Sequence, residues 1–195
     1  LQSDYPERTI RLLMCPKILG ANGKVINLVQ MSREASYNYL VINDSDIMVS
    51  RRYLQNVMSA FNPVNRPGPR VGMVTTLYRG KAHQTLGSRM EALGISTDFI
   101  AGVLTARQLE HGLRFALGAT LAISQEALDA IGGLEPLVDY LADDYELGAR
   151  VWAKGFQVAL SPEVVETYVP PYTFPQFLDH QTRWSRSTRD SRRFG

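Results

Sequence analysis

One apolar run limits the possible folds of this chain more than any other feature. Residues Tyr39–Asn43 read YLVIN, and the polar triplet Asp44-Ser45-Asp46 follows them directly. Unbroken apolar runs of this length are typical of strands buried on both faces, in the middle of a parallel sheet. Folds with such sheets bind their ligands beyond the carboxyl ends of the strands. The run therefore predicts an α/β domain with Asp44 and Asp46 at its ligand-binding edge.

Alternating strand-like and helix-like segments fill the rest of the chain. Short apolar runs predict strands at residues 9–15, 71–78, 115–123, 158–160 and 164–169. Longer periodic segments predict helices at residues 23–31, 50–60, 83–99, 125–131, 143–155 and 173–189, and a turn-rich loop at 61–70. Asn22, Ser50 and Ser124 are suited to cap three of these helices, and the pair Gly132-Gly133 to end one. The alternation predicts a mostly parallel central sheet flanked by helices.

Composition narrows the class of protein. The chain has 195 residues, of which 45% are hydrophobic and 21% charged, as is ordinary for one globular domain with a buried core. A net charge of +2 gives no reason to expect nucleic acid as a partner. Cys15 is the single cysteine, which excludes an intrachain disulfide and a multi-cysteine metal site. No signal peptide is recognisable, and no apolar run approaches the roughly 20 residues that span a bilayer.

Asp44 and Asp46 form the first candidate site. Two carboxylates one residue apart at a strand end can both approach a divalent cation, magnesium or manganese, that holds the diphosphate of a nucleotide sugar. Acidic residues can also simply end a strand and begin a turn. The position after an apolar strand leaves both interpretations open.

Asp143 and Asp144 form a second acidic pair, at the start of a predicted helix. Either carboxylate could cap the helix, and the helix dipole would favour its ionised form. Capping explains only one of the two. The other is suited to accept a proton from an attacking hydroxyl, so capping and general base catalysis both remain open.

His180, Arg183 and Trp184 fall on one face of the last predicted helix. A guanidinium can bind a leaving diphosphate through two hydrogen bonds, and an indole offers a platform for a sugar or an acceptor. The alternative is an amphipathic helix on which Trp184 packs against the core and Arg183 is solvated. Lys24 is a weaker candidate, because a glycine-rich turn entering a helix presents amides and an ammonium to phosphate, yet most such lysines are surface residues.

The end of the chain is strongly basic. Arginines gather in the last thirteen residues, at Arg183, Arg186, Arg189, Arg192 and Arg193. Such a patch is typical of a juxtamembrane stretch attracted to anionic headgroups, or of an ordinary solvated helix end. Because the chain also lacks an initiator methionine and ends without a helix cap, we expect it to be part of a longer protein.

Taken together, these segments resemble the ceramide glucosyltransferase family and its bacterial hopanoid-associated relatives. The resemblance is carried, in order and over nearly the whole chain, by GANGKVINL, VINDSDI, GATLAISQEALDAIGGL, LADDYELGARVWAKG and HQTRW. It implies a glycosyltransferase of the GT-A fold that uses a divalent cation, magnesium or manganese. It also implies inverting transfer of a hexose from a UDP-sugar to a lipid hydroxyl, ceramide-like or hopanoid-like.

The resemblance also assigns roles to single residues. Asp44 lies at the nucleotide-sugar carboxylate of the family, Asp46 at its metal ligand and Asp144 at its catalytic base. Arg183 and Trp184 complete the diphosphate and acceptor site. Lys24 and His180 are further substrate-binding candidates.

Three departures from the family pattern affect these assignments. His180 stands where arginine or glutamine is usual, and Asp44-Ser45-Asp46 stands where the animal ceramide enzymes have D-S-G, which points to the bacterial branch. The uridine-binding aspartate of the first strands has no counterpart. We therefore expect residues 1–195 to form a single catalytic domain, N-terminally truncated and without the first nucleotide-binding strands and the flanking transmembrane helices.

Several functions remain compatible with the sequence. The resemblance implies a membrane-associated parent protein whose catalytic domain faces the cytoplasm, as at a bacterial inner membrane. A polysaccharide or polyprenyl-phosphate glycosyltransferase would use the same core with another acceptor. A non-catalytic nucleotide-sugar-binding fragment is the alternative outside enzymes.

Overall fold

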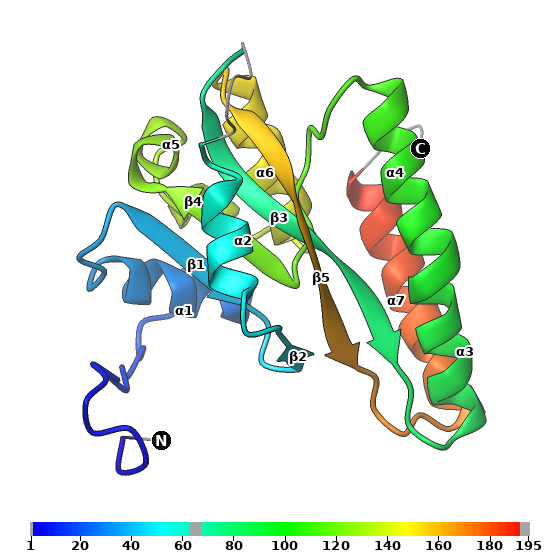
Figure 1. Ribbon diagram of the computed structural model, residues 1–195. Helices are drawn as coiled ribbons and strands as arrows, with labels where there is room; N and C mark the ends of the chain where they lie inside the picture. Colours follow the sequence, from blue (N-terminus) through cyan, green and yellow to red (C-terminus); the bar gives the residue numbers. More distant parts are fainter. Residues whose placement is uncertain (1, 63–67, 192–195) are drawn as a thin grey trace.

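The computed structural model describes residues 2–62 and 68–191, which form one mixed α/β domain (Figure 1). Its centre is a five-stranded sheet in the order β1-β4-β3-β5-β2. The strands are β1 Tyr39–Asn43, β2 Ile47–Met48, β3 Val71–Lys81, β4 Thr120–Ser124 and β5 Gln157–Tyr168. The helices are α1 Gly23–Ser32, α2 Tyr53–Ser59, α3 Leu86–Gly94, α4 Ile100–Leu109, α5 Gln125–Ala130, α6 Asp143–Ala153 and α7 Phe174–Ser191. A π-helical turn, η1 Ile95–Phe99, joins α3 to α4, and a 3-10 turn, η2 Glu135–Leu137, precedes α6.

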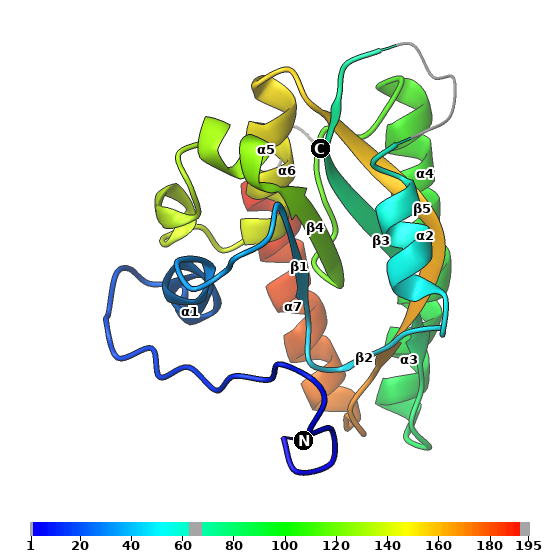
Figure 2. The same ribbon diagram turned by 60° about the vertical axis from the view of Figure 1, so that its left-hand side comes forward.

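Side chains alternate between the two faces of the sheet along each strand, and both faces pack against helices. Met73, Leu121 and Ile123 point into a core shared with α1, α5 and α6. Val74 and Ala122 point the other way and pack with α2. Beyond these layers, the α3–η1–α4 rod and α7 extend along the end of β3 (Figures 1 and 2).

The prediction of a mostly parallel sheet is wrong for the part of the chain that the structure describes. In that part only β3 and β5 pair in parallel, whereas β4 runs antiparallel to β1 and β3, and β2 antiparallel to β5. The strand Tyr39–Asn43 is correctly predicted, but among the described residues it pairs with β4 alone and lies at an edge. The run is also not buried on both faces, since Val41 is 36% exposed, so an apolar run of this length determines neither the direction of a strand nor its place in the sheet.

The strand predicted at residues 9–15 is also wrong. This segment runs as unpaired chain past α1, with Leu12 and Met14 each 86% exposed. It is held further along by Gln30, whose side chain accepts a hydrogen bond from the Lys17 amide at 3.2 Å and donates one to the Lys17 carbonyl at 3.1 Å. Apolar residues form a strand only where a neighbouring strand pairs with them, and none of the described strands pairs with this segment.

Cap residues predicted several helix boundaries correctly. The side chains of Asn22 and Ser124 cap α1 and α5 by accepting hydrogen bonds from Val25 and Ala127, both at 3.2 Å. Gly132 and Gly133, with φ of 84° and 80°, end α5 as predicted. Ser50 does not cap α2, which starts only at Tyr53.

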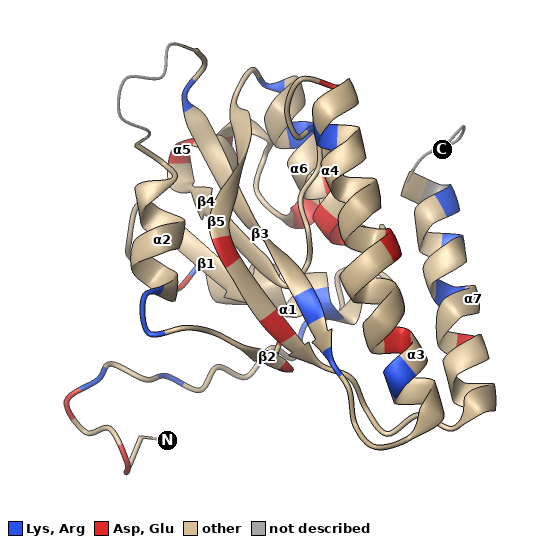
Figure 3. Cartoon of the chain, turned by 45° about the vertical axis from the view of Figure 1, so that its right-hand side comes forward, with Lys and Arg blue, Asp and Glu red and all other residues tan. Residues whose placement is uncertain are grey.

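Other differences concern element length. Residues 158–160 and 164–168 belong to one long strand, β5, which ends one residue before the predicted limit and whose pairing with β3 shifts register twice. The predicted helix at 83–99 is replaced by α3, η1 and α4, which together reach Leu109. The basic residues of α7 include Arg183, Arg186 and Arg189 (Figure 3), whereas Arg192, Arg193 and part of the predicted loop at 61–70 lie outside the described residues. No helix in the described ranges combines the length and the apolar character needed to cross a membrane.

Candidate functional site

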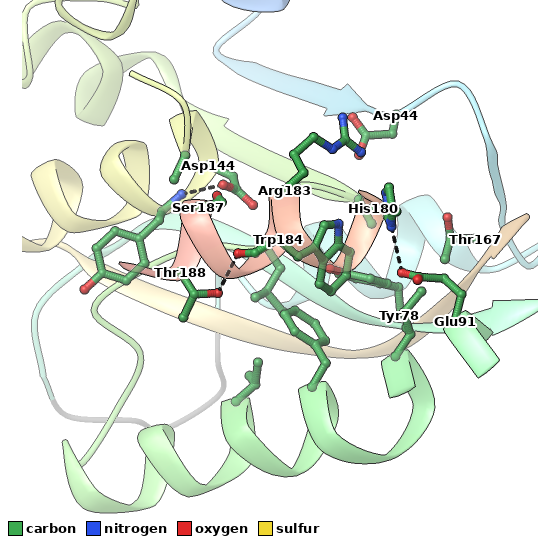
Figure 4. A pocket seen from close by; sticks show the side chains of 18 of the residues that line it. Asp44, Tyr78, Glu91, Asp144, Thr167, His180, Arg183, Trp184, Ser187 and Thr188 are labelled. Carbon is green, nitrogen blue, oxygen red and sulfur yellow. Dashed lines mark hydrogen bonds and ion pairs between the residues drawn. The ribbon is translucent and has the colours of Figure 1, made fainter. Parts of the chain in front are cut away.

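The seven side chains singled out in the sequence line one cavity of about 630 Å³. They come from the start of α1, the segment after β1, the first turn of α6 and one face of α7: Lys24, Asp44, Asp46, Asp144, His180, Arg183 and Trp184. Figure 4 labels five of them, Asp44, Asp144, His180, Arg183 and Trp184. The volume lies within the range of roughly 300–1,000 Å³ that is usual for small-molecule sites. Residues spread over most of the chain are therefore brought together in a space that fits a ligand.

Asp44 and Asp46 follow β1, and the chain there is held on both sides. The side-chain amide of Asn43 donates hydrogen bonds to the Tyr53 hydroxyl at 2.7 Å and to the Ala119 carbonyl at 3.1 Å. Asp46 accepts a hydrogen bond from the Thr167 hydroxyl at 3.3 Å. Asp44 is half-buried and Asp46 is exposed, so both carboxylates can reach the solvent-filled cavity.

Lys24 joins the two acidic motifs. Its ammonium nitrogen lies 3.0 Å from an Asp44 carboxylate oxygen and 3.5 Å from an Asp143 oxygen. Burial opposes the charge on Lys24, but Asp143 and Asp44 outweigh that effect and raise its pKa. The sequence left open whether Lys24 faces a phosphate or is an ordinary surface lysine, and its role in substrate binding remains a prediction. The structure shows a cation that balances two carboxylates and keeps them close to each other.

Asp144 does not cap α6. Ala142 occupies the N-cap position without a side-chain hydrogen bond, so the capping interpretation of Asp143 and Asp144 is wrong. Asp144 lies in the first helical turn, where its carboxylate accepts a hydrogen bond from the Tyr145 amide at 2.8 Å. Burial, followed by the charge of Asp143, raises the pKa of Asp144, while the Tyr145 amide and Lys24 act in the opposite direction. A carboxylate with a raised pKa and access to a cavity is suited to take up a proton.

Gly118 separates the two acidic motifs at the cavity wall. A Cβ atom built on it would lie 3.1 Å from an Asp144 carboxylate oxygen and 3.6 Å from an Asp44 oxygen. The missing side chain therefore leaves both carboxylates facing the same space. The small-residue segment GAT was visible in the sequence, but its position between Asp44 and Asp144 was not.

Glu91 is a buried member of the site that the sequence analysis missed. Only 1% of its surface is exposed, and it accepts hydrogen bonds from His180 Nδ1 at 3.0 Å and Gln181 Nε2 at 2.7 Å (Figure 4). Both donors lie on α7, whereas Glu91 lies on α3. This contact fixes α7 beside the cavity, and it commits one nitrogen of His180 to a structural contact.

Trp184 and Arg183 differ in their surroundings. The indole of Trp184 packs edge-on against Phe99 of η1, with ring centroids 5.7 Å apart, and also borders the cavity. Arg183 is exposed, and in Figure 4 its side chain extends toward Asp44. The two alternatives for α7 are thus both partly realised, since Trp184 contributes to packing and the same face lines the cavity.

Tyr78 of β3 is a second lining residue that the sequence did not indicate. Burial raises the pKa of its phenol, and the charges of Asp144 and Asp44 raise it further. The hydroxyl therefore stays protonated and can donate a hydrogen bond inside the cavity. Its position inside an apolar strand pattern gave no signal of this role.

The side chains that are available as metal ligands limit how a cation could bind. Among residues 2–62 and 68–191, no group of three or more histidine, cysteine, aspartate or glutamate side chains could hold a metal ion. Magnesium sites commonly use one or two carboxylates and complete their coordination with water and substrate phosphates. Asp44 and Asp46 match that arrangement, so the residues fit a cation that is shared with a diphosphate.

The contact of Glu91 with α7 leads to a stability prediction. Glu91→Ala leaves two donors on α7 without their acceptor and should lower the free energy of unfolding by about 2 to 3 kcal/mol. Glu91→Gln keeps an acceptor and should lose less. Urea denaturation measures both, with Glu34→Ala as the control, because the exposed pair of Glu34 with Arg11 is worth less than about 1 kcal/mol. Equal stability of Glu91→Ala and the parent would contradict the role of Glu91.

Comparison with known proteins gives a family match along the entire chain. The model described as Glycosyl transferase family 21 matches residues 1–195. Ceramide glucosyltransferase 3 of Caenorhabditis elegans is 22% identical over 184 residues, and ceramide glucosyltransferase 1 of the same organism is 23% identical over 180 residues. These alignments cover 94% and 92% of this chain but 39% and 37% of the two relatives. The chain thus spans about two fifths of their length.

A solved structure shares the fold. The mannosyltransferase PcManGT of Pyrobaculum calidifontis, in complex with GDP-Man and Mn2+, superposes with a TM-score of 0.65 at 17% identity. The match covers 97% of this chain and 47% of that one. The predicted GT-A fold is confirmed, with a mixed instead of a mostly parallel sheet among the described strands.

Proposed function

Since the chain belongs to Glycosyl transferase family 21, we propose that its cavity transfers a hexose from a UDP-sugar to the hydroxyl of a lipid. The observation that carries the proposal is the convergence of Asp44, Asp144 and Arg183 on one cavity, with Gly118 leaving the two carboxylates open to it. The similarity to ceramide glucosyltransferases supports a ceramide-like acceptor. A hopanoid-like acceptor rests on the sequence resemblance alone.

The donor would bind at the end of the cavity formed by the segment after β1. Asp44 and Asp46 would hold a divalent cation together with the donor diphosphate, and that cation would supply positive charge beside the departing UDP. Arg183, which is exposed on the cavity face of α7, would bind the same diphosphate from the other side. Lys24 would keep Asp44 and Asp143 in place when no donor is bound.

The transfer step follows from these positions. Asp144 takes the proton of the acceptor hydroxyl while the oxygen of that hydroxyl forms a bond to the anomeric carbon of the donor sugar. The bond from that carbon to the diphosphate breaks, and UDP leaves with the negative charge that Arg183 offsets. Because attack and departure occur on opposite faces, an α-linked donor gives a β-linked product.

The raised pKa of Asp144 leads to a pH prediction. The base must be ionised, so kcat/KM should fall at acidic pH with a limb that follows Asp144. Asp143 raises this pKa and Lys24 lowers it. The acid limb should therefore move to lower pH in Asp143→Asn and to higher pH in Lys24→Gln. Profiles of kcat/KM against pH measure both shifts, and shifts in the same direction would contradict the assignment of Asp144 as the base.

A donor and acceptor screen tests the proposed function. Full-length protein is supplied with UDP-glucose, UDP-galactose or UDP-N-acetylglucosamine and with ceramide, a hopanoid alcohol, an oligosaccharide or a polyprenyl phosphate. Release of UDP should require one of the two lipid alcohols. Faster UDP release with the oligosaccharide or the polyprenyl phosphate would show that the acceptor is not a lipid alcohol. Binding of the UDP-sugar without UDP release in every mixture would indicate a binding protein.

A further inference from the structure

The half of the cavity that η1 and α4 line has apolar side chains among its lining residues. Its lining on the α4 side comes from η1 and α4, including Ile95, Phe99 and Val103. Phe115 and Tyr145, whose rings stack at 5.5 Å between centroids, line the same cavity beside Asp144. This half also contains the carboxylate of Asp98, which is exposed to solvent. The cavity therefore brings apolar side chains together with the carboxylate of Asp144.

Small residues keep this half of the cavity open between α4 and α7. The cavity is lined by Gly102 and Ala106 on α4 and by Ser187 and Ser191 on α7. A Cβ atom built on Gly102 would meet no other atom within 4 Å. Figure 4 shows Trp184, Ser187 and Thr188 of α7 facing the side chains that rise from the α4 side. The space beside Gly102 is therefore open, and because Gly102 also lines the cavity, a larger side chain there would narrow it without displacing protein.

The chemistry of this space favours a hydrocarbon ligand. A sugar or another hydroxyl-rich ligand would lose its hydrogen bonds to water against Ile95, Phe99 and Val103, and an unpaired polar group is costly to bury. A hydrocarbon chain gains free energy from the same contact. An acceptor hydroxyl at Asp144 could thus have its chain lying along the half lined by η1 and α4.

We infer that the space between α4 and α7 binds the hydrocarbon chain of the acceptor, and that Gly102 determines how bulky a chain fits. The inference rests on the proposed function, since it places the acceptor hydroxyl at Asp144. It adds a binding site and a specificity-determining residue outside the acidic and arginine motifs. In helical position 102, leucine has a higher helix propensity than glycine, so Gly102→Leu should fold.

The test compares Gly102→Leu with Ala101→Leu in the full-length protein. Ala101 is the adjacent exposed residue of α4 and does not line the cavity, so it is a matched control. The acceptors are primary alcohols of increasing alkyl length, measured below their micelle concentrations. For wild type, kcat/KM should rise by up to about fourfold per methylene until the space is filled. Gly102→Leu should lose at least about tenfold with the longest alcohol and little with the shortest, whereas Ala101→Leu should follow wild type.

Donor affinity and acceptor binding are measured separately. UDP-sugar affinity should be the same in both variants, because neither substitution changes a residue that is proposed to bind the donor. Equilibrium binding of the longest alcohol without donor should weaken in Gly102→Leu alone. Equal alcohol binding by the two variants, or an equal response of kcat/KM to chain length, would overturn the inference. If alcohol binding depends on Gly102 but no sugar is transferred to any acceptor, the proposed function fails while the hydrocarbon site stands.

Discussion

Asp144→Asn should lower the rate of sugar transfer by about 10²- to 10⁴-fold, the usual contribution of a general base. The asparagine keeps the shape of the side chain and can still accept the hydrogen bond that the Tyr145 amide donates at 2.8 Å. It cannot take up the proton of the acceptor. Single-turnover rates with saturating donor measure the loss, and Asp129→Asn, an exposed carboxylate on α5, is the control.

The same substitution should raise the thermal unfolding midpoint. Burial and the charge of Asp143 raise the pKa of Asp144 in the folded protein, so ionising this carboxyl opposes folding. The stabilising effect of asparagine should be fully present above the folded-state pKa of Asp144. It should disappear as the pH falls below the pKa of the unfolded chain, where aspartate is protonated in both states. Unfolding scans at pH 8 and pH 3 test the sign, and full-rate transfer by Asp144→Asn would exclude Asp144 as the base.

Removal of divalent cations should have the second large effect. A bound cation stabilises the negative charge that develops on the leaving group in the transition state by several kcal/mol. Chelation should therefore slow transfer by at least about 100-fold. Added manganese or magnesium should restore the rate. The described residues offer only paired carboxylates such as Asp44 and Asp46, which makes binding of cation and donor interdependent.

Asp46→Asn tests whether the effect of the cation depends on this carboxylate or only on the net charge of the protein. It should raise the manganese concentration needed for half-maximal rate, and Asp179→Asn, which removes an exposed carboxylate on α7, should not. Transfer that proceeds at the same rate in excess chelator would contradict the proposed cation. Arg183 and Lys24 would then be the cationic groups left to offset the charge of UDP at this end of the cavity.

Much of the fold was predictable because its signals are local. Asn22 and Ser124 cap the helices that follow them, and Gly132 ends α5, since each of these roles depends on a few neighbouring residues. Strand direction and pairing are not local. Apolar residues at 9–15 and at β1 have similar patterns, yet the first segment is unpaired and the second pairs antiparallel with β4.

In the candidate site, too, local features were predictable and long-range contacts were not. The order of the motifs predicted which side chains line the cavity, although their catalytic roles remain predictions. The contact between Glu91 and His180 joins residues 89 positions apart, and a single glutamate on a helix usually indicates a solvated face. The bridge from Lys24 to Asp143 likewise depends on how α1 and α6 meet. Long-range contacts of this kind cannot be predicted from residue spacing.

We propose that this cavity moves a hexose from a UDP-sugar to a lipid hydroxyl with inversion. The most direct measurement follows the anomeric signals by NMR while full-length protein acts on ¹³C-labelled UDP-glucose, with ceramide and manganese present. We predict that the α-linked donor signal decays as a β-linked glycolipid signal and free UDP increase in equal amounts. An unchanged donor signal, or an α-linked product, would contradict the account.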